Sequence, residues 1–167
     1  MKIGLILISF FLIFKAGKKP EPRQAFDKSG YYRVMASGDL AAIDSELVIL
    51  DHAMPKEKEA YEGALQMRKA GFLRRPKEKL AVFRSGAVKL ETALARDSAN
   101  GEYHFLRLII QEHAPAVVHY NKDKEKDSQY IYRSFKNLSP AVQQAIIDYS
   151  RHSKVIRAER IVRKDNH

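Results

Sequence analysis

Three histidines and two glutamates lie close together in the chain and are the first residues that could do chemistry. They are His104, His113 and His119, with Glu102 and Glu112 beside them. A metal ion needs ligands that converge on one point. On a continuous helix His104 and His113 stand about 180° apart, and the sequence has no HExxH or His-x-x-x-His pair. We therefore interpret these histidines as ordinary surface or half-buried residues and expect no metal site.

Glu62 and Glu91 stand near small residues and are candidates for buried carboxylates. General acid–base catalysis needs two groups that converge in a cleft. Spacing alone does not bring these two together, so we interpret both as parts of solvated helix faces. The sequence has no cysteine, no GxSxG and no glycine-rich phosphate loop. It therefore predicts no catalytic residue and no cofactor, and an enzyme with an unrecognised site is kept as an alternative.

The composition predicts one all-α domain. The chain has 167 residues, of which 45% are hydrophobic and 30% charged, with only 8 glycines and 6 prolines. The apolar run from Ile3 to Phe14 has the length of a signal-peptide core. We expect residues 1–17 to be a signal peptide or an uncleaved N-terminal anchor, 18–23 a linker, 24–153 the helical domain and 154–167 a basic tail. The protein is then exported, and periplasmic or secreted.

Apolar periodicity predicts six to seven helices joined by short breaks. Ser37-Gly38-Asp39 ends a first helix that starts near Gln24 and caps a second helix, which keeps Glu46 outside. A third helix starts near Pro55 and ends at Gly71. Pro76 opens the fourth, and Ser139-Pro140, a capping serine and a first-turn proline, opens the last.

Two central helices should hold the core. On the first, apolar residues recur on one face, at Leu80, Phe83, Ala87, Leu90 and Leu94. The second, 103–110, is apolar nearly all round, which is typical of a helix buried between others. We expect Phe83, Leu90, Leu106 and Leu108 in the core. The alternating charges of 122–127 indicate a solvated loop or first turn.

The segment 87–108 resembles a junction between tetratricopeptide repeats. Gly86, Leu90 and Ala93 match the small-large-small spacing of a B helix, and Asp97-Ser98-Ala99-Asn100 matches the turn that follows it. Arg107 stands where the next helix normally has leucine, and no strict 34-residue repeat runs through the chain. The resemblance implies an antiparallel array of helical hairpins with a concave binding face, on which Tyr61, Tyr103 and Arg107 are candidate binding residues.

Two further segments, 55–65 and 137–145, resemble parts of small exported bacterial proteins. That resemblance implies export and a helical domain, and it implies no activity.

The formal net charge is +10, and basic residues are frequent near the C-terminus, at Arg151, Lys154, Arg157 and Arg160. We interpret this tail as a solvated helix end, because Val155, Ile156, Ile161 and Val162 are too few to anchor it. The functional hypothesis is a protein-interaction or scaffold module with an unknown protein or peptide partner. The alternative is a basic binder of an anionic envelope surface through the tail, with nucleic acid the less favoured ligand.

Overall fold

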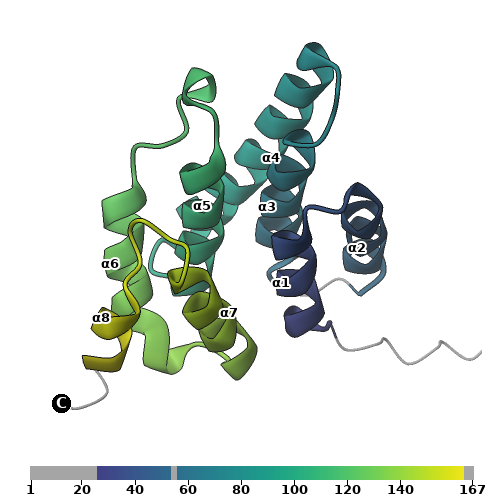
Figure 1. Ribbon diagram of the computed structural model, residues 1–167. Coiled ribbons are helices and arrows are strands. Elements are labelled where there is room, and N and C mark those ends of the chain that lie inside the picture. Colours follow the sequence, from purple (N-terminus) through teal and green to yellow (C-terminus); the bar gives the residue numbers. More distant parts are fainter. Residues whose placement is uncertain (1–25, 54–55, 164–167) are drawn as a thin grey trace, which may run out of the picture.

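The computed structural model describes residues 26–53 and 56–163, and all their regular structure is helical (Figure 1). The elements are α1 (Lys28–Ser37), α2 (Leu40–Ala53), α3 (Lys58–Ala70), α4 (Pro76–Arg96), α5 (Gly101–His113), η1 (Ala116–Val118), α6 (Lys124–Ser134), η2 (Phe135–Asn137), α7 (Pro140–Ser150) and α8 (Ala158–Arg163). The all-α prediction is confirmed. The described residues form eight α-helices where six to seven were expected, and α8 comes from the expected tail. The predicted signal or anchor and the linker lie outside the described residues.

Several helix ends fall where the sequence marks them, although α1 and α3 begin at Lys28 and Lys58 and not near Gln24 and Pro55 as expected. Gly38 follows α1 in the left-handed conformation, with φ 71°. The Asp39 carboxylate accepts the backbone N–H groups of Ala41 and Ala42 at 2.9 and 3.3 Å, which caps α2. Pro76 and Pro140 begin their helices as predicted, although the Ser139 hydroxyl makes no capping hydrogen bond.

The core is built around α5 and the α3–α4 hairpin. Every residue of α5 from Gly101 to Gln111 is buried, which confirms the prediction for this helix. The helices α3 and α4 pack closely along each other, and Gly63 and Gly86 face each other across their contact. On the other side α5 packs against α6, while α1 and α7, far apart in the sequence, contact each other (Figure 1).

Most expected core residues are buried, and two expectations are wrong. Phe83, Leu90, Leu106 and Leu108 lie in the core. Leu80 is 38% exposed, because it lies in the first turns of α4, where most residues from 76 to 81 are exposed. Glu46, expected outside, is buried at 7% exposure. Burial, and then the nearby negative charge of Asp27, raises the pKa of the Glu46 carboxyl.

The tail is anchored more firmly than expected. Ile156 is fully buried and Ile161 is 5% exposed, so the expectation that this segment has too few apolar residues to anchor it is wrong. The backbone is held as well, because the Tyr132 hydroxyl accepts the Arg157 N–H at 2.7 Å. Glu112 accepts hydrogen bonds from the Ser153 hydroxyl at 2.6 Å and the Lys154 N–H at 2.8 Å. The segment after α7 therefore packs on α6 through Tyr132 and on α5 through Glu112.

Candidate functional site

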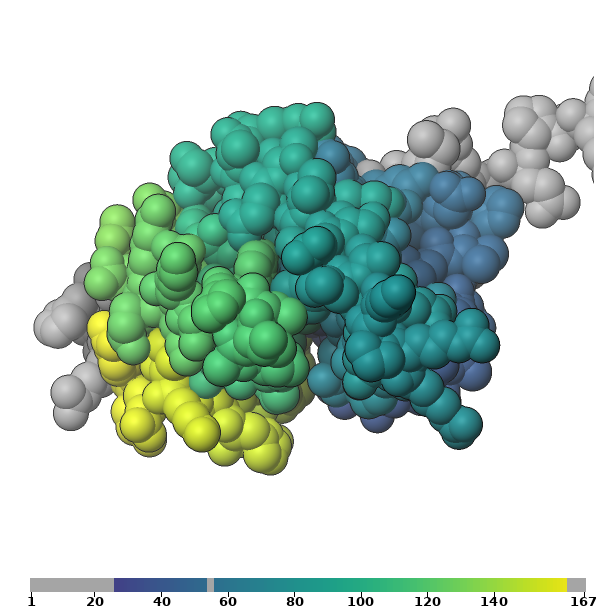
Figure 2. Space-filling view, turned by 90° about the horizontal axis from the view of Figure 1, so that it is seen from above, coloured from purple at the N-terminus to yellow at the C-terminus, as the bar shows by residue number. Residues whose placement is uncertain are grey.

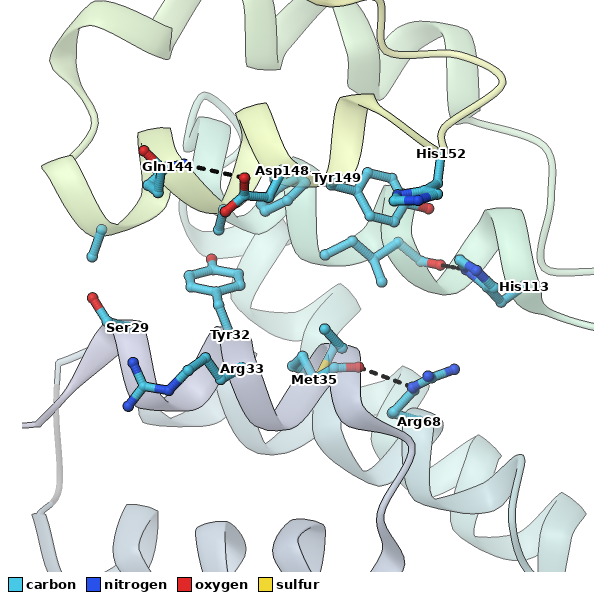
Figure 3. Close-up of a pocket in the computed structure, with 15 residues that line it drawn as sticks. Ser29, Tyr32, Arg33, Met35, Arg68, His113, Gln144, Asp148, Tyr149 and His152 are labelled. Carbon is cyan, nitrogen blue, oxygen red and sulfur yellow. Dashed lines mark hydrogen bonds between the residues drawn. The ribbon is translucent and has the colours of Figure 1, made fainter.

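A cavity of about 710 Å³ opens between α1 and α7 (Figure 3). Its floor is apolar and comes from three helices, with Tyr32 and Met35 from α1, Phe105 and Ile109 from α5, and Tyr149 from α7. Aromatic contacts fix this floor, since the ring centroid of Phe105 lies 5.6 Å from that of Tyr32 and 5.7 Å from that of Tyr149. A preformed apolar cleft with few polar groups is the usual form of a binding site.

The long sides of the cleft are polar and exposed. Arg33 on α1 lies 3.5 Å from Asp27, and Asp148 on α7 lies 3.5 Å from Arg151. The Gln144 amide donates to the Asp148 carboxylate at 3.1 Å. Because these charges are solvated and already paired, we expect them to contribute little to affinity.

One end of the cleft is basic. Arg68, His113 and His152 lie together at that end (Figure 3). Arg68 donates from Nε to the Met35 carbonyl at 3.0 Å, and its guanidinium lies 5.0 Å from the centre of the Phe72 ring. Burial lowers the pKa of Arg68. Among the described residues no carboxylate lies within 4.0 Å of this half-buried cation.

Tyr149 adds a polar group near the basic end. Its ring lies 6.2 Å from that of His113, and its buried hydroxyl has no hydrogen-bond partner in the described part of the chain. Burial, and then the negative charge of Glu112, raises the pKa of Tyr149. The hydroxyl therefore stays protonated at neutral pH. The end of the cleft thus offers a cation and a hydroxyl to an acidic group, beside an apolar floor.

A second cluster resembles a catalytic pair but is closed. His104 Nδ1 lies 2.7 Å from Asp127 Oδ1, and its Nε2 lies 2.9 Å from the Ser98 carbonyl oxygen. Both partners are acceptors, and the tautomer decides which ring nitrogen donates a proton to its partner. The His104 ring also stacks on Tyr130 with 4.0 Å between centroids. With side-chain exposures of 3% and 0% for His104 and Asp127, neither ring nitrogen is open to a substrate in this structure.

Arg107 completes this buried network. It donates to both carboxylate oxygens of Asp127, at 3.0 and 2.6 Å, and to Glu91 at 2.9 Å. Gln111 donates to the same Asp127 carboxylate at 3.0 Å. The interpretation of His104 as a surface or half-buried residue, and of 122–127 as solvated, is wrong for His104 and Asp127. The signal was missed because these two residues are 23 positions apart and only the α5–α6 packing brings them together.

A third polar cluster surrounds Glu102. The hydroxyls of Tyr32 and Tyr61 donate to Glu102 Oε1 at 3.0 and 2.7 Å, and Lys28 donates to Oε2 at 2.8 Å. Tyr31 donates to the Tyr61 carbonyl at 3.0 Å. These three donors engage both carboxylate oxygens, so the cluster joins α1, α3 and α5 rather than presenting a free group.

The binding residues expected from the sequence are not brought together. Tyr61 is fully buried, and Tyr103 and Arg107 are 8% and 7% exposed. Of the tail residues, Arg151 lies beside Asp148, Arg160 lies over the Tyr132 ring at 4.3 Å, and Lys154 and Arg157 are exposed. The cleft residues Arg68 and Tyr149 were not singled out for binding, because nothing in the sequence shows that α3 and α7 end near each other.

The glutamates considered for acid–base work are both engaged. Glu62 lies 2.6 Å from Lys89 and 3.5 Å from Lys58. Glu91 accepts from Arg107 and from the Tyr120 hydroxyl, the latter at 2.6 Å. Over residues 26–53 and 56–163 no group of three or more His, Asp or Glu side chains gathers as a metal ion would require. In the same residues no helix is both long and apolar enough to cross a bilayer.

Comparison with protein-family models, with curated proteins and with solved structures gives no match to this chain. The tetratricopeptide-like resemblance therefore stays a prediction.

Proposed function

We propose that this chain is an exported helical interaction module that binds a peptide segment of a partner protein in the cleft between α1 and α7. The observation that carries the proposal is the pairing of an apolar floor with a half-buried arginine that has no carboxylate partner among the described residues. The segment that fits carries an apolar side chain for the floor and a carboxylate next to it for Arg68. The export part rests on the apolar run 3–14 of the sequence.

The cleft suits a peptide because it is open and runs between two helices, α1 and α7, over an apolar floor. Apolar side chains of a ligand gain about 25 cal/mol for each Å² removed from water. A carboxylate that replaces water at Arg68 gains a charge-assisted hydrogen bond, which is stronger than a neutral one. The Tyr149 hydroxyl, which has no partner in the described residues, can donate to the same carboxylate or to a peptide carbonyl.

The test is a selection from a displayed library of random peptides, followed by affinity measurement with synthetic peptides. We expect the selected sequences to share an apolar residue followed closely by Asp or Glu. Ala36→Trp fills the cleft from the exposed side of α1, and it should weaken binding at least about tenfold, or 1.4 kcal/mol. Ala95→Trp, on an exposed position of α4 outside the cleft, is the matched control and should bind as the unchanged protein does.

Arg68→Gln tests the acidic preference separately. It should abolish the preference for Asp or Glu while the apolar requirement remains. If the selected peptides bound Ala36→Trp with the same affinity as the unchanged protein, the binding site would lie elsewhere and the proposal would be wrong.

A further inference from the structure

The end of the α3–α4 hairpin carries a second surface of a different kind. Between residues 68 and 84 the sequence has seven Lys and Arg against one acidic residue, Glu78. The hairpin end lies away from α7 and α8 (Figure 1), and Figure 2 looks down on it. We name this surface the basic tip and define it by six exposed residues, Phe72, Arg74, Arg75, Lys77, Leu80 and Arg84.

The cations of the basic tip form no ion pairs with the described residues of the domain. Nearby, Lys69 is paired with Asp44 at 2.6 Å and Arg68 is bonded to the Met35 carbonyl. In contrast, none of the four tip cations has a carboxylate of the described residues within 4.0 Å. Four solvated cations in one place therefore remain free to meet an anionic partner.

The position of these cations on the helix is unfavourable for the protein alone. Arg75 occupies the N-cap of α4 without making a capping bond, and Arg74 and Lys77 flank it. The N-terminal end of a helix carries partial positive charge, so cations there are repelled, and only Glu78 in the first turn offsets this. An external anion would relieve the repulsion.

Apolar side chains are interleaved with the cations. Phe72 and Leu80 are each 38% exposed. On the outer face of α4, Lys77, Leu80 and Arg84 follow one another at three- and four-residue steps, and Val88, 67% exposed, continues the line. A partner that only neutralises charge would leave these apolar side chains in water. The headgroup region of a bilayer, in contrast, accepts both cations and partly buried apolar groups.

We propose that the basic tip docks the domain on the surface of an anionic phospholipid bilayer. Lys and Arg contact the headgroup phosphates, while Phe72 and Leu80 enter the boundary between headgroups and acyl chains. Nucleic acid phosphates would engage the four cations as well, but they would leave the exposed apolar side chains of Leu80 and Val88 in water, so nucleic acid is the less favoured partner. The tip also fits better than the tail, where Arg151 is paired with Asp148 and Arg160 is stacked on Tyr132.

The experiment measures co-sedimentation of the full chain with phosphatidylglycerol-rich vesicles and with phosphatidylcholine vesicles, at low and high salt. The apolar run 3–14 contributes equally to both vesicle types, so the difference between them isolates the charge-dependent part. Each cation near an anionic surface contributes about a fivefold change in partition, from about 1 kcal/mol. Arg74→Gln with Arg75→Gln should lower partition onto anionic vesicles by about 25-fold, and Leu80→Ser should lower it without changing the salt dependence.

Two double variants with the same loss of charge act as controls. Lys122→Gln with Lys126→Gln changes exposed lysines around the start of α6 and should retain binding. Lys154→Gln with Arg157→Gln tests the tail and should also retain it. Unchanged partition of the tip variant, or a loss confined to the tail variant, overturns the proposal. So does binding to a duplex DNA oligonucleotide that depends on the tip, if anionic vesicles do not bind. Circular dichroism of each variant separates lost contact from lost folding.

Discussion

The carbonyl oxygen of Gly63 on α3 lies 2.5 Å from the position that a Cβ atom would take at Gly86 on α4. That position is also 2.9 Å from the backbone nitrogen of Met67, so the obstacle is backbone and cannot turn aside. The two helices approach this closely because neither residue has a side chain.

Gly86→Ala should therefore separate α3 from α4 and destabilise the fold by about 1–3 kcal/mol, as overpacking does. Urea unfolding measures the change. Gly30→Ala is the matched control, because the added Cβ meets only the ends of two flexible side chains, those of Asp27 and Arg33. That variant should be neutral or stabilising by up to about 1 kcal/mol. Equal effects in the two variants would show that the helix contact is not tight.

Asp127→Ala should be among the most destabilising single changes in the described chain. It leaves the buried Arg107 cation and the His104 ring without the carboxylate that they share, and removing one partner of a buried ion pair costs about 3–5 kcal/mol. Asp148→Ala removes an exposed carboxylate and should cost less than about 0.5 kcal/mol. A small effect at Asp127, seen by thermal or urea unfolding, would contradict the buried network.

Because of the tyrosines around Glu102, we expect the free energy of unfolding to fall at alkaline pH. Burial, followed by the negative charge of Glu102, raises the pKa of Tyr32 and Tyr61 above the ordinary value of 10.0. Above pH 10 the unfolded chain loses these protons while the folded chain keeps them, so stability is full below pH 10 and declines as pH rises further. Urea unfolding at several pH values measures the slope.

The double variant Tyr32→Phe with Tyr61→Phe should show a shallower decline above pH 10, because it has two fewer protons to lose on unfolding. Tyrosinate absorbance shows when each proton leaves. If the double variant declined as steeply as the unchanged protein, the two hydroxyls would not be held neutral by the fold.

The buried tail gives a prediction opposite to that of a solvated helix end. Ile156→Ala should cost about 2–5 kcal/mol, because the side chain is fully buried. Ile147→Ala makes the same chemical change where the side chain is 36% exposed, and its cost should be well below that of Ile156→Ala. Similar melting temperatures for both variants would mean that the segment after α7 is not docked in solution.

Arg75→Asp should stabilise α4 while it weakens vesicle binding. The backbone at Arg75 is extended, with φ −84° and ψ 122°, as an N-cap requires, and an aspartate there can accept the free N–H groups. The expected gain is about 0.5–2 kcal/mol. Arg74→Asp changes charge equally but stands one residue before the cap, so the difference in melting temperature between the two variants isolates capping. Equal melting temperatures for the two variants would show that residue 75 is not the N-cap.

Local signals predicted the elements, and distant pairings escaped prediction. Pro76, Pro140 and Gly38 act on their immediate neighbours, so the helix ends that they mark were predictable. The apolar run in α5 likewise predicted its burial. Asp127 appeared solvated because its neighbours are charged, and only the contact of α6 with α5 shows its partners. The cleft was equally hidden, since Arg68 and Tyr149 lie 81 positions apart in the sequence.

The contact between α1 and α7 joins the first helix of the described residues to the last helix but one. In an open stack of hairpins each unit touches only its neighbours, so stability is nearly a sum of local terms and a terminal hairpin can be removed alone. Here the loss of α1 would also uncover α7 and the Glu102 cluster. The domain should therefore unfold in one cooperative transition, and its folding rate should depend on closing a chain segment of more than a hundred residues.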